Sequence, residues 1–120
     1  MRRVVARDGA VVLAETPVPG VPDNGYLVQA EYSLISPGTE LGLIAASADG
    51  TERSLGYSLV GRQVGAGPEA GPLPPRQLLA CAGYQWAWHA EYVAVPPLMV
   101  SVVPGALDSR AATFTTLGAV

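Results

Sequence analysis

Residues 80–95 read ACAGYQWAWHAEYVAV and collect the scarcest side chains of the chain. They hold the only Cys, the only His and both Trp of a sequence otherwise dominated by Ala, Gly, Val, Leu and Pro. Two strands are predicted here, over about residues 77–82 and 89–95, with Tyr84 to Trp88 as their connection. The stretch is therefore expected to form either the wall of a site or the aromatic part of a small core.

Short strands separated by turns are predicted along the rest of the chain. Asp8-Gly9 stands between two β-branched runs, which is typical of a type I′ hairpin turn. Apolar and polar residues alternate over 26–35 as in a half-buried strand, which places Tyr32 on the buried face. Within a further strand over 55–64, Gly61 indicates a bulge or a close backbone approach. Roughly six or seven such strands predict a mainly β fold, a small barrel or sandwich.

Two helical segments complete this expectation. A short helix is predicted over residues 41–45, and a second one through 110–117 is predicted to begin at Asp108 or Ser109 as its N-cap. This C-terminal helix is apolar, and the chain stops at Val120 without a capping residue. We therefore expect that more chain normally follows it.

Length and charge argue against several classes of protein. The 120 residues correspond to one domain, and the seven Arg are scattered without a cluster at a net charge of −3. Nucleic-acid binding needs a basic stripe, so it is not expected. No apolar run approaches the roughly 20 residues that span a bilayer, and the N-terminus lacks the core of a secretory signal. No membrane association and a cytoplasmic location are therefore expected.

The side chains that usually bind metals are scarce. A zinc site takes three or four N, S or O ligands, whereas this chain has one Cys, one His and no ligand-pair spacing. Cys81 is expected to be inert packing, and a single Cys excludes an internal disulfide. His89 remains open between a structural or surface role and a place in a site. The Gly-rich residues 65–71 lack the spacing of a dinucleotide fingerprint and are predicted to form a loop.

Several hydroxyl and aromatic residues are ambiguous on their own. Ser36 and Thr39 lie on a turn that leaves a strand, where they could form an ST-turn or a helix cap instead of a site. Tyr57 and Ser58 follow Gly56 and are equally open. The aromatic residues of the connection could form either core packing or the apolar wall of a pocket.

Five segments of the sequence, in this order, together resemble a known protein family, although each segment alone is too short to indicate it. They are YSLISPGTE at 32–40, LGYSLVGR at 55–62, ACAG at 80–83, HAEYVAVP at 89–96 and AATFTTLGAV at 111–120. They cover most of the chain from Tyr26 onward. The set resembles the N-terminal, GroES-like domain of medium-chain dehydrogenases and reductases, with most similarity to the branch that lacks zinc.

The resemblance implies a fold and an activity. The fold is a partly open β-barrel over residues 1–120, with short helices and a C-terminal helix. Such a barrel carries the substrate side of a cleft, and a Rossmann domain, absent from this chain, holds NAD(P)H. In zinc-dependent members, metal ligands stand at the places of Ser36, Tyr57 and Ser58, which are poor zinc donors, so no zinc is implied.

The resemblance also assigns roles to individual residues. Tyr57 is the candidate catalytic residue, because its hydroxyl could orient or protonate a carbonyl or alcohol substrate. The candidate cofactor-binding residues are Ser36, Thr39 and Thr116, and the candidate substrate pocket consists of Tyr84, Trp86 and His89.

Two hypotheses on function follow. The first is the substrate-side domain of a zinc-independent NAD(P)-dependent oxidoreductase, a fragment or a natural truncation, inactive without a Rossmann domain or a partner that supplies it. The second is a stand-alone GroES-like module that acts by homo-oligomerisation or partner binding through an exposed apolar patch on its terminal helix.

Overall fold

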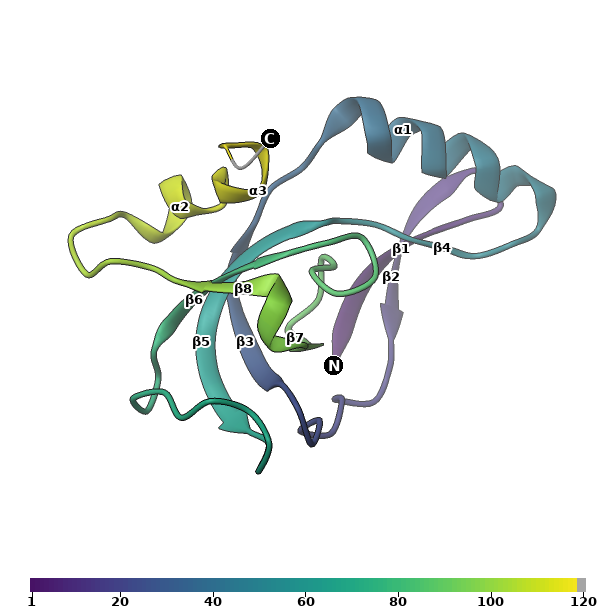
Figure 1. Cartoon of the computed structure of the whole chain (residues 1–120). Coiled ribbons are helices and arrows are strands. Elements are labelled where there is room, and N and C mark those ends of the chain that lie inside the picture. The colour runs from purple at the N-terminus through teal and green to yellow at the C-terminus, as the bar shows by residue number, and fades with distance from the viewer. Residues whose placement is uncertain (119–120) are drawn as a thin grey trace.

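The computed structural model describes residues 1–118, which form two antiparallel sheets (Figure 1). Arg3 of β1 and Ala90, just before β7, form a bridge that joins the two sheets into one curved, incompletely closed barrel. The mainly β architecture predicted from the sequence is confirmed. The three-stranded sheet has the order β2-β1-β4, with β1 Arg2–Arg7, β2 Ala10–Glu15 and β4 Arg53–Ser54. The five-stranded sheet has the order β7-β3-β5-β6-β8, with β3 Tyr26–Ser33, β5 Ser58–Ala66, β6 Leu78–Ala82, β7 Tyr92–Val95 and β8 Val100–Val102.

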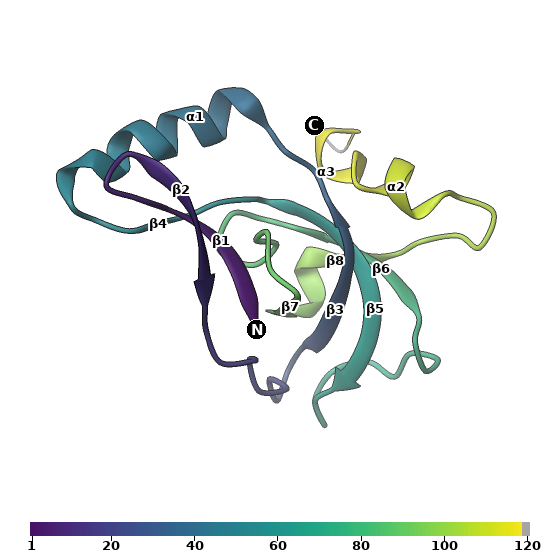
Figure 2. The ribbon, with the colours of Figure 1, turned by 180° about the vertical axis from the view of Figure 1, so that it is seen from behind.

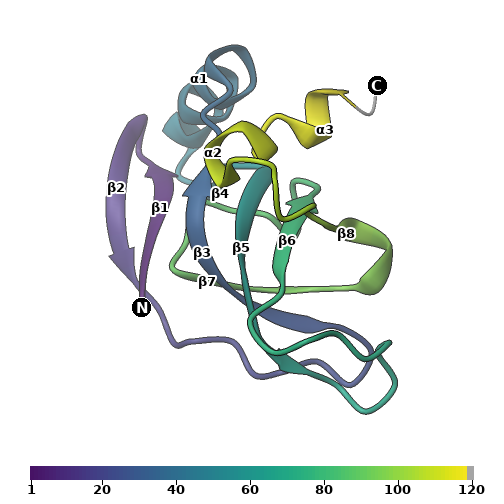
Figure 3. The same ribbon diagram turned by 90° about the vertical axis from the view of Figure 1, so that its left-hand side faces the viewer.

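The helices gather at one end of this barrel (Figure 3). Helix α1 spans Pro37–Ala46 and packs across the hairpin of β1 and β2, as Figure 2 shows from behind. It begins earlier than predicted because proline is well tolerated in a first helical turn. The predicted C-terminal helix is divided into α2, Ser109–Ala112, and α3, Thr115–Gly118. Short 3₁₀ turns cover Ser47–Asp49 and Pro97–Met99.

The C-terminal segment agrees in part with the sequence. The carboxylate of Asp108 accepts a 2.7 Å hydrogen bond from the N–H of Arg110, so the predicted N-cap is confirmed. Ala119 and Val120, which end the last segment of the resemblance and on which the uncapped helix end was inferred, lie outside the described residues. No helix within residues 1–118 is long and apolar enough to cross a membrane.

Local backbone geometry confirms two predicted features and corrects a third. Asp8 and Gly9 both have positive φ, 52° and 79°, as a type I′ hairpin requires. A Cβ on Gly61 would lie 2.2 Å from the carbonyl oxygen of Gln29, so the backbones of β3 and β5 approach closely there. The register shifts beside it, between Ala30 and Tyr32. The alternation of buried and exposed side chains ends at this bulge, and Tyr32, predicted to be buried, is 45% exposed.

Two apolar clusters lie against β5 and β6 of the five-stranded sheet. Consecutive residues of β5 contribute to different clusters, Leu59 to one and Val60 to the other, because side chains alternate across a strand. Each such fully buried side chain contributes on the order of 1.5–3 kcal/mol. Cys81 belongs to the larger cluster, and burial raises the pKa of its thiol to about 12, which agrees with inert packing.

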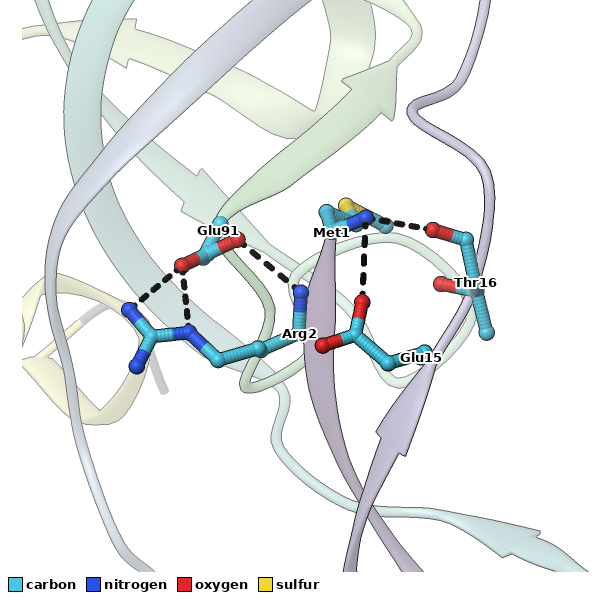
Figure 4. A network of polar contacts seen from close by, with 5 residues as sticks. All are labelled: Met1, Arg2, Glu15, Thr16 and Glu91. Atoms are coloured by element: carbon cyan, nitrogen blue, oxygen red, sulfur yellow. Dashed lines mark hydrogen bonds and ion pairs between the residues drawn. The ribbon is translucent and has the colours of Figure 1, made fainter.

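The start of β1 is tied to the segment before β7 by charged contacts (Figure 4). The main-chain N–H of Arg2 donates to Glu91 at 2.9 Å, and its guanidinium pairs with the same carboxylate at 2.6 Å. The ammonium group of Met1 donates to the carbonyl of Thr16 at 2.6 Å and lies 3.7 Å from Glu15. These contacts position the residues around His89, which form the site.

Candidate functional site

A pair of hydroxyl groups lies where β3 passes into α1. Ser36 occupies the N-cap position of α1, and Tyr57 lies just before β5. The Tyr57 hydroxyl donates to the Oγ of Ser36 at 3.0 Å, and both residues are half-buried. Within the described part of the chain, the Ser36 side chain makes no capping bond to its helix. The Ser36 hydroxyl therefore accepts the hydrogen bond from Tyr57 and can donate its own proton to a further acceptor.

Glu40 takes over the capping that the Ser36 side chain leaves undone. Its Oε2 accepts the Ser36 N–H at 2.5 Å, while its own N–H donates to the Ser36 carbonyl at 2.9 Å. A carboxylate in the first turn of a helix is also favoured by the helix dipole. Glu40 is only 5% exposed, so its charge must be matched by partners in the interior.

The second partner of Glu40 is the single histidine. The Nε2 of His89 lies 2.5 Å from Oε1 of Glu40, and its Nδ1 lies 2.6 Å from the Oγ of Ser33. The two side chains are 10% and 7% exposed. Because an ionised carboxylate can only accept, Nε2 carries the shared proton, and in the neutral ring Nδ1 accepts the Ser33 hydroxyl proton.

The imidazole is held in place by the backbone around it. The His89 N–H donates to the Leu55 carbonyl, and the His89 carbonyl accepts the Val4 N–H, both at 2.9 Å. Gly56 has φ 102°, and a Cβ there would lie 2.7 Å from the His89 nitrogen and 3.0 Å from Nδ1. Only glycine therefore leaves room for this ring at this backbone conformation.

Ser33 and His89 line two neighbouring surface depressions. One is an apolar cavity of about 440 Å³ between α1 and the β1–β2 hairpin. The other, of about 320 Å³, is more polar and includes Arg2, Arg3 and Glu91. A mostly apolar cavity with a few converging polar groups is the usual composition of a small-molecule site. The apolar cavity is lined by Val4, Val11, Ile35, Pro37, Leu41, Ile44 and Leu55, together with Ser33, Glu40 and His89.

The predicted cofactor-binding residues do not all come together. Ser36 joins Tyr57, whereas Thr116 on α3 donates to the buried Oγ of Ser58 at 2.9 Å. Ser58 in turn donates to the Thr113 carbonyl at 2.5 Å and so fastens the C-terminal helices to β5. Thr39 is exposed in the first turn of α1. Thr116 lines a separate depression of about 190 Å³ beside β6 and β8.

The aromatic connection forms turns instead of an extended chain. The N–H groups of Trp86 and Ala87 both donate to the Gly83 carbonyl, at 3.0 and 2.8 Å. Trp86 packs against the larger core cluster and lines a depression of about 230 Å³ to which His89 does not contribute. Tyr84 is 42% exposed. The structure thus separates Trp86 from His89, which the sequence had placed in one pocket.

Trp88, the residue before His89, contacts Arg3 of the N-terminal strand β1. The guanidinium of Arg3 lies over its ring, 3.9 Å from the ring centre, and also donates to the hydroxyl of Ser54. Burial lowers the pKa of the Arg3 guanidinium. This cation–π contact and the ion pair of Arg2 connect the N-terminal strand to the wall that carries His89.

The sequence patterns indicate neither Glu40 nor Ser33 as a site residue. A weak signal exists for Glu40, since acidic residues are favoured in the first turn of a helix, although Glu40 stands one residue beyond the position of a capping box. That signal predicts a cap, not a partner for His89. Nothing local indicates Ser33. Among residues 1–118, no three His, Cys, Asp or Glu side chains converge in a way that could hold a metal ion.

Comparison with known proteins adds the fold family. The sequence matches no protein-family model and no curated protein. An alcohol dehydrogenase superfamily protein from Novosphingobium aromaticivorans matches 98% of the chain with a TM-score of 0.83 and 26% identity. Galactitol-1-phosphate dehydrogenase from Escherichia coli matches 95% with a TM-score of 0.80 and 20% identity. Escherichia coli quinone oxidoreductase complexed with NADPH matches 98% with a TM-score of 0.78 and 12% identity.

The matches extend over only part of each relative. This chain spans 38% of the Novosphingobium protein, 41% of galactitol-1-phosphate dehydrogenase and 37% of quinone oxidoreductase. In each case nearly the whole chain corresponds to a minor part of a larger enzyme. The chain has the fold of the N-terminal, GroES-like domain of medium-chain dehydrogenases and reductases.

Proposed function

We propose that this chain is the substrate-side domain of a zinc-independent, NAD(P)-dependent oxidoreductase of small carbonyl or alcohol compounds. A Rossmann domain, in the same protein or supplied by a partner, would complete it. The observation that carries the proposal is the Tyr57–Ser36 hydroxyl pair at the position where the resemblance places metal ligands. The GroES-like fold supports it, since that fold is shared with enzymes of this class.

The hydroxyl pair has the chemistry that reduction of a carbonyl requires. NAD(P)H, when bound, supplies the hydride. Tyr57 would donate a hydrogen bond to the carbonyl oxygen and protonate it as negative charge develops, which replaces the polarisation that zinc gives elsewhere. The Ser36 hydroxyl would hold Tyr57 in place and accept its hydrogen bond between turnovers.

The proposed cofactor contacts are hydroxyl groups at one end of the barrel. The Ser36 side chain is free of capping duty within the described residues, and Thr39 is exposed, so both retain hydrogen-bonding capacity for a nicotinamide or its ribose. Thr116 is half-buried against Ser58 and would contribute from α3. We further propose that His89, Tyr84 and Trp86 contact the substrate, with His89 at the apolar cavity.

The available donors support independence from zinc. Tyr57 and Ser36 are neutral hydroxyls, which are poor zinc ligands. The only thiol, Cys81, lies in the core, where its raised pKa of about 12 keeps it protonated at neutral pH. A thiolate ligand would therefore require the core to open.

The test uses the longest natural protein that contains this chain. It should oxidise NADPH or NADH in the presence of small carbonyl compounds, and chelators should not affect the rate. Tyr57→Phe should lower kcat/KM by about 10²–10⁴-fold, the usual contribution of a general acid. Tyr32→Phe, which changes an exposed tyrosine on β3 that does not line the apolar cavity, is the matched control and should be silent. Absence of nicotinamide binding, or a fully active Tyr57→Phe variant, would refute the proposal.

A second candidate function has its own supporting observation. Large apolar side chains are exposed on and beside α2 and β8, with Phe114 at 56%, Leu98 at 93% and Val102 at 54%. Such a patch favours a module that acts by self-association or partner binding. Size-exclusion chromatography with light scattering should then show an oligomer of the 120-residue chain that Phe114→Ser dissociates. A monomer at high concentration would exclude self-association.

A further inference from the structure

The proposed oxidoreductase chemistry uses His89 only as a substrate contact and gives the hydrogen-bonded Ser33–His89–Glu40 cluster no chemical role. Among residues 1–118, the cluster is joined to the Tyr57–Ser36 pair through main-chain groups of Ser36, whose N–H donates to the Glu40 carboxylate and whose carbonyl accepts the Glu40 N–H. An amide N–H does not release its proton at ordinary pH, so no proton can pass from Tyr57 to His89 along this route. The two groups are therefore chemically separate, although they are adjacent.

We propose that Ser33, His89 and Glu40 form a catalytic triad that hydrolyses esters with a small apolar acyl group. The nucleophile, the base and the orienting carboxylate form a continuous chain, with 2.6 Å between Ser33 Oγ and His89 Nδ1 and 2.5 Å between His89 Nε2 and Glu40. These distances satisfy the requirement for an activated serine, with the two ring nitrogens exchanged relative to the usual triad, in which Nε2 faces the serine and Nδ1 the carboxylate. Glu40 is a positioning residue here, and its second oxygen is fixed by the Ser36 N–H.

Burial is graded in the direction that catalysis needs. Ser33 is exposed at the end of β3, His89 is nearly covered, and Glu40 is buried. The attacking oxygen is thus accessible to a substrate, whereas the carboxylate is shielded from water, which strengthens its interaction with an imidazolium. A histidine and a glutamate that merely joined α1 to the barrel would not require an exposed hydroxyl on the remaining ring nitrogen.

The two depressions give the reacting ester a place on each side of Ser33. The apolar cavity of about 440 Å³ would take the acyl group, since aliphatic side chains from α1 and the hairpin dominate its wall. The more polar depression of about 320 Å³ would take the leaving alcohol. Arg2 and Arg3 line that second depression. The Arg2 guanidinium is paired with Glu91, and that of Arg3 lies over Trp88 and donates to Ser54, so a carbonyl oxygen would share these cationic groups with their present partners.

The reaction balances with water as the only co-reactant. Ser33 Oγ bonds to the carbonyl carbon, its proton passes to His89 Nδ1, and Glu40 stabilises the imidazolium. The bond from the carbonyl carbon to the leaving oxygen breaks, and His89 returns the proton to that oxygen, which releases the alcohol. Water then attacks the acyl-Ser33 carbonyl and gives a proton to His89. The bond from the carbonyl carbon to Ser33 Oγ then breaks, His89 returns its proton to that oxygen, and the carboxylic acid leaves with the Ser33 hydroxyl and the neutral imidazole restored.

The experiment measures hydrolysis and covalent labelling of the full chain without any nicotinamide. The protein should cleave p-nitrophenyl butyrate, and a fluorophosphonate should modify Ser33, as read by mass spectrometry of the peptide. Ser33→Ala should abolish the adduct and lower kcat/KM at least about 10²-fold. Glu40→Gln should lower kcat under conditions in which circular dichroism shows the variant to be fully folded, whereas a purely structural role would leave kcat per folded molecule unchanged. Ser101→Ala, an exposed serine on β8, is the matched control and should keep both signals.

Several outcomes would overturn the triad. They are the absence of hydrolysis, an adduct at another serine, and hydrolysis that persists in Ser33→Ala, which would mean that His89 reacts alone. Ser33 is exposed, so its alanine variant is expected to fold, and circular dichroism checks this. Because the assay contains no NAD(P)H, a negative result leaves the proposed oxidoreductase function to its own test.

Discussion

The Tyr57–Ser36 pair and the Ser33–His89–Glu40 cluster share no residue and are linked through Ser36, but they differ in charge and in burial. The first joins two neutral, half-buried hydroxyls, and the second joins ionisable groups that are mostly buried. Ser36 serves the first with its side chain and the second with its main-chain N–H. The comparison shows that one helix N-terminus can hold two polar groups close together without a route for proton transfer between them, because the link is a main-chain amide.

The largest expected effect on stability comes from Gly56, which packs against the backbone and imidazole of His89. Gly56→Ala forces a Cβ to within 2.7 Å of the His89 backbone at φ 102°. We expect it to lower the free energy of unfolding by on the order of 2–4 kcal/mol, from backbone strain and crowding. Urea denaturation measures this loss.

A glycine in open space is the control for that change. Among the described residues, nothing lies within 4 Å of a Cβ added to Gly42 in α1. Gly42→Ala should therefore stabilise the protein, by about 0.5–1 kcal/mol, because alanine is the better helix former. If Gly56→Ala were as stable as the wild type, the ring of His89 would not be held as described.

The next effect separates the charged cluster from the neutral pair. Glu40→Gln removes a buried carboxylate that accepts from both His89 and the Ser36 N–H. A loss of about 1–3 kcal/mol is expected, since hydrogen bonds to charged groups are the stronger ones. Thermal and urea denaturation measure it. An unchanged stability would indicate that Glu40 is not ionised in the folded protein.

A smaller loss is expected for the neutral pair. Tyr57→Phe removes one hydrogen bond between half-buried hydroxyls, which corresponds to about 0.5–1.5 kcal/mol. The same urea titration applies, with Tyr32→Phe as its reference. If Tyr57→Phe lost more free energy of unfolding than Glu40→Gln, the Tyr57–Ser36 pair would contribute more to stability than the Glu40 contacts, contrary to the expectation.

The smallest effect on stability is expected from the exposed Arg2–Glu91 ion pair, which serves as a reference for the buried His89–Glu40 pair. The main-chain N–H and then the side chain of Arg2 hold the pKa of Glu91 below its ordinary value of 4.5. Because this pKa is lower in the folded state, the unfolded chain binds more protons in this range. The stability from Glu91 is therefore present above about pH 4.5 and is lost as the pH falls through the folded pKa.

Glu91→Gln tests this linkage directly. Urea midpoints of the variant and the wild type should differ at pH 7 and converge as the pH is lowered below about 4.5. The difference at pH 7 should be small, because both partners are largely exposed and solvent screens the pair. A difference that stays constant down to acid pH would place its cause outside the ionisation of Glu91.

Much of the fold could be predicted from local signals. The Asp8-Gly9 turn, the close approach at Gly61 and the Asp108 cap each depend on a few neighbouring residues, and the structure contains all three. The predicted burial of Tyr32 was wrong, because a single extra residue in β3 interrupts the alternation of buried and exposed side chains. Bulges depend on the partner strand, so alternation in one strand cannot reveal them.

Less of the candidate site could be predicted. The resemblance singled out Ser36 and Tyr57, and they do meet, across 21 residues of sequence. The resemblance assigned Trp86 and His89 to one substrate pocket, whereas residues 83–87 form turns and the two side chains line different depressions. Glu40 and Ser33 reach His89 across 49 and 56 residues of sequence, and no local pattern encodes contacts at such separations.

By itself, the sequence determined the class of the fold, the main turns and caps, and the burial of Cys81. Those features follow from backbone preferences and apolar periodicity, which act between near neighbours. Only the tertiary structure decided what residues 80–95 do. Most of that stretch is barrel wall and core, while His89 pairs with Glu40 and Ser33, because the buried carboxylate needs a partner for its second oxygen besides the nearby Ser36 N–H.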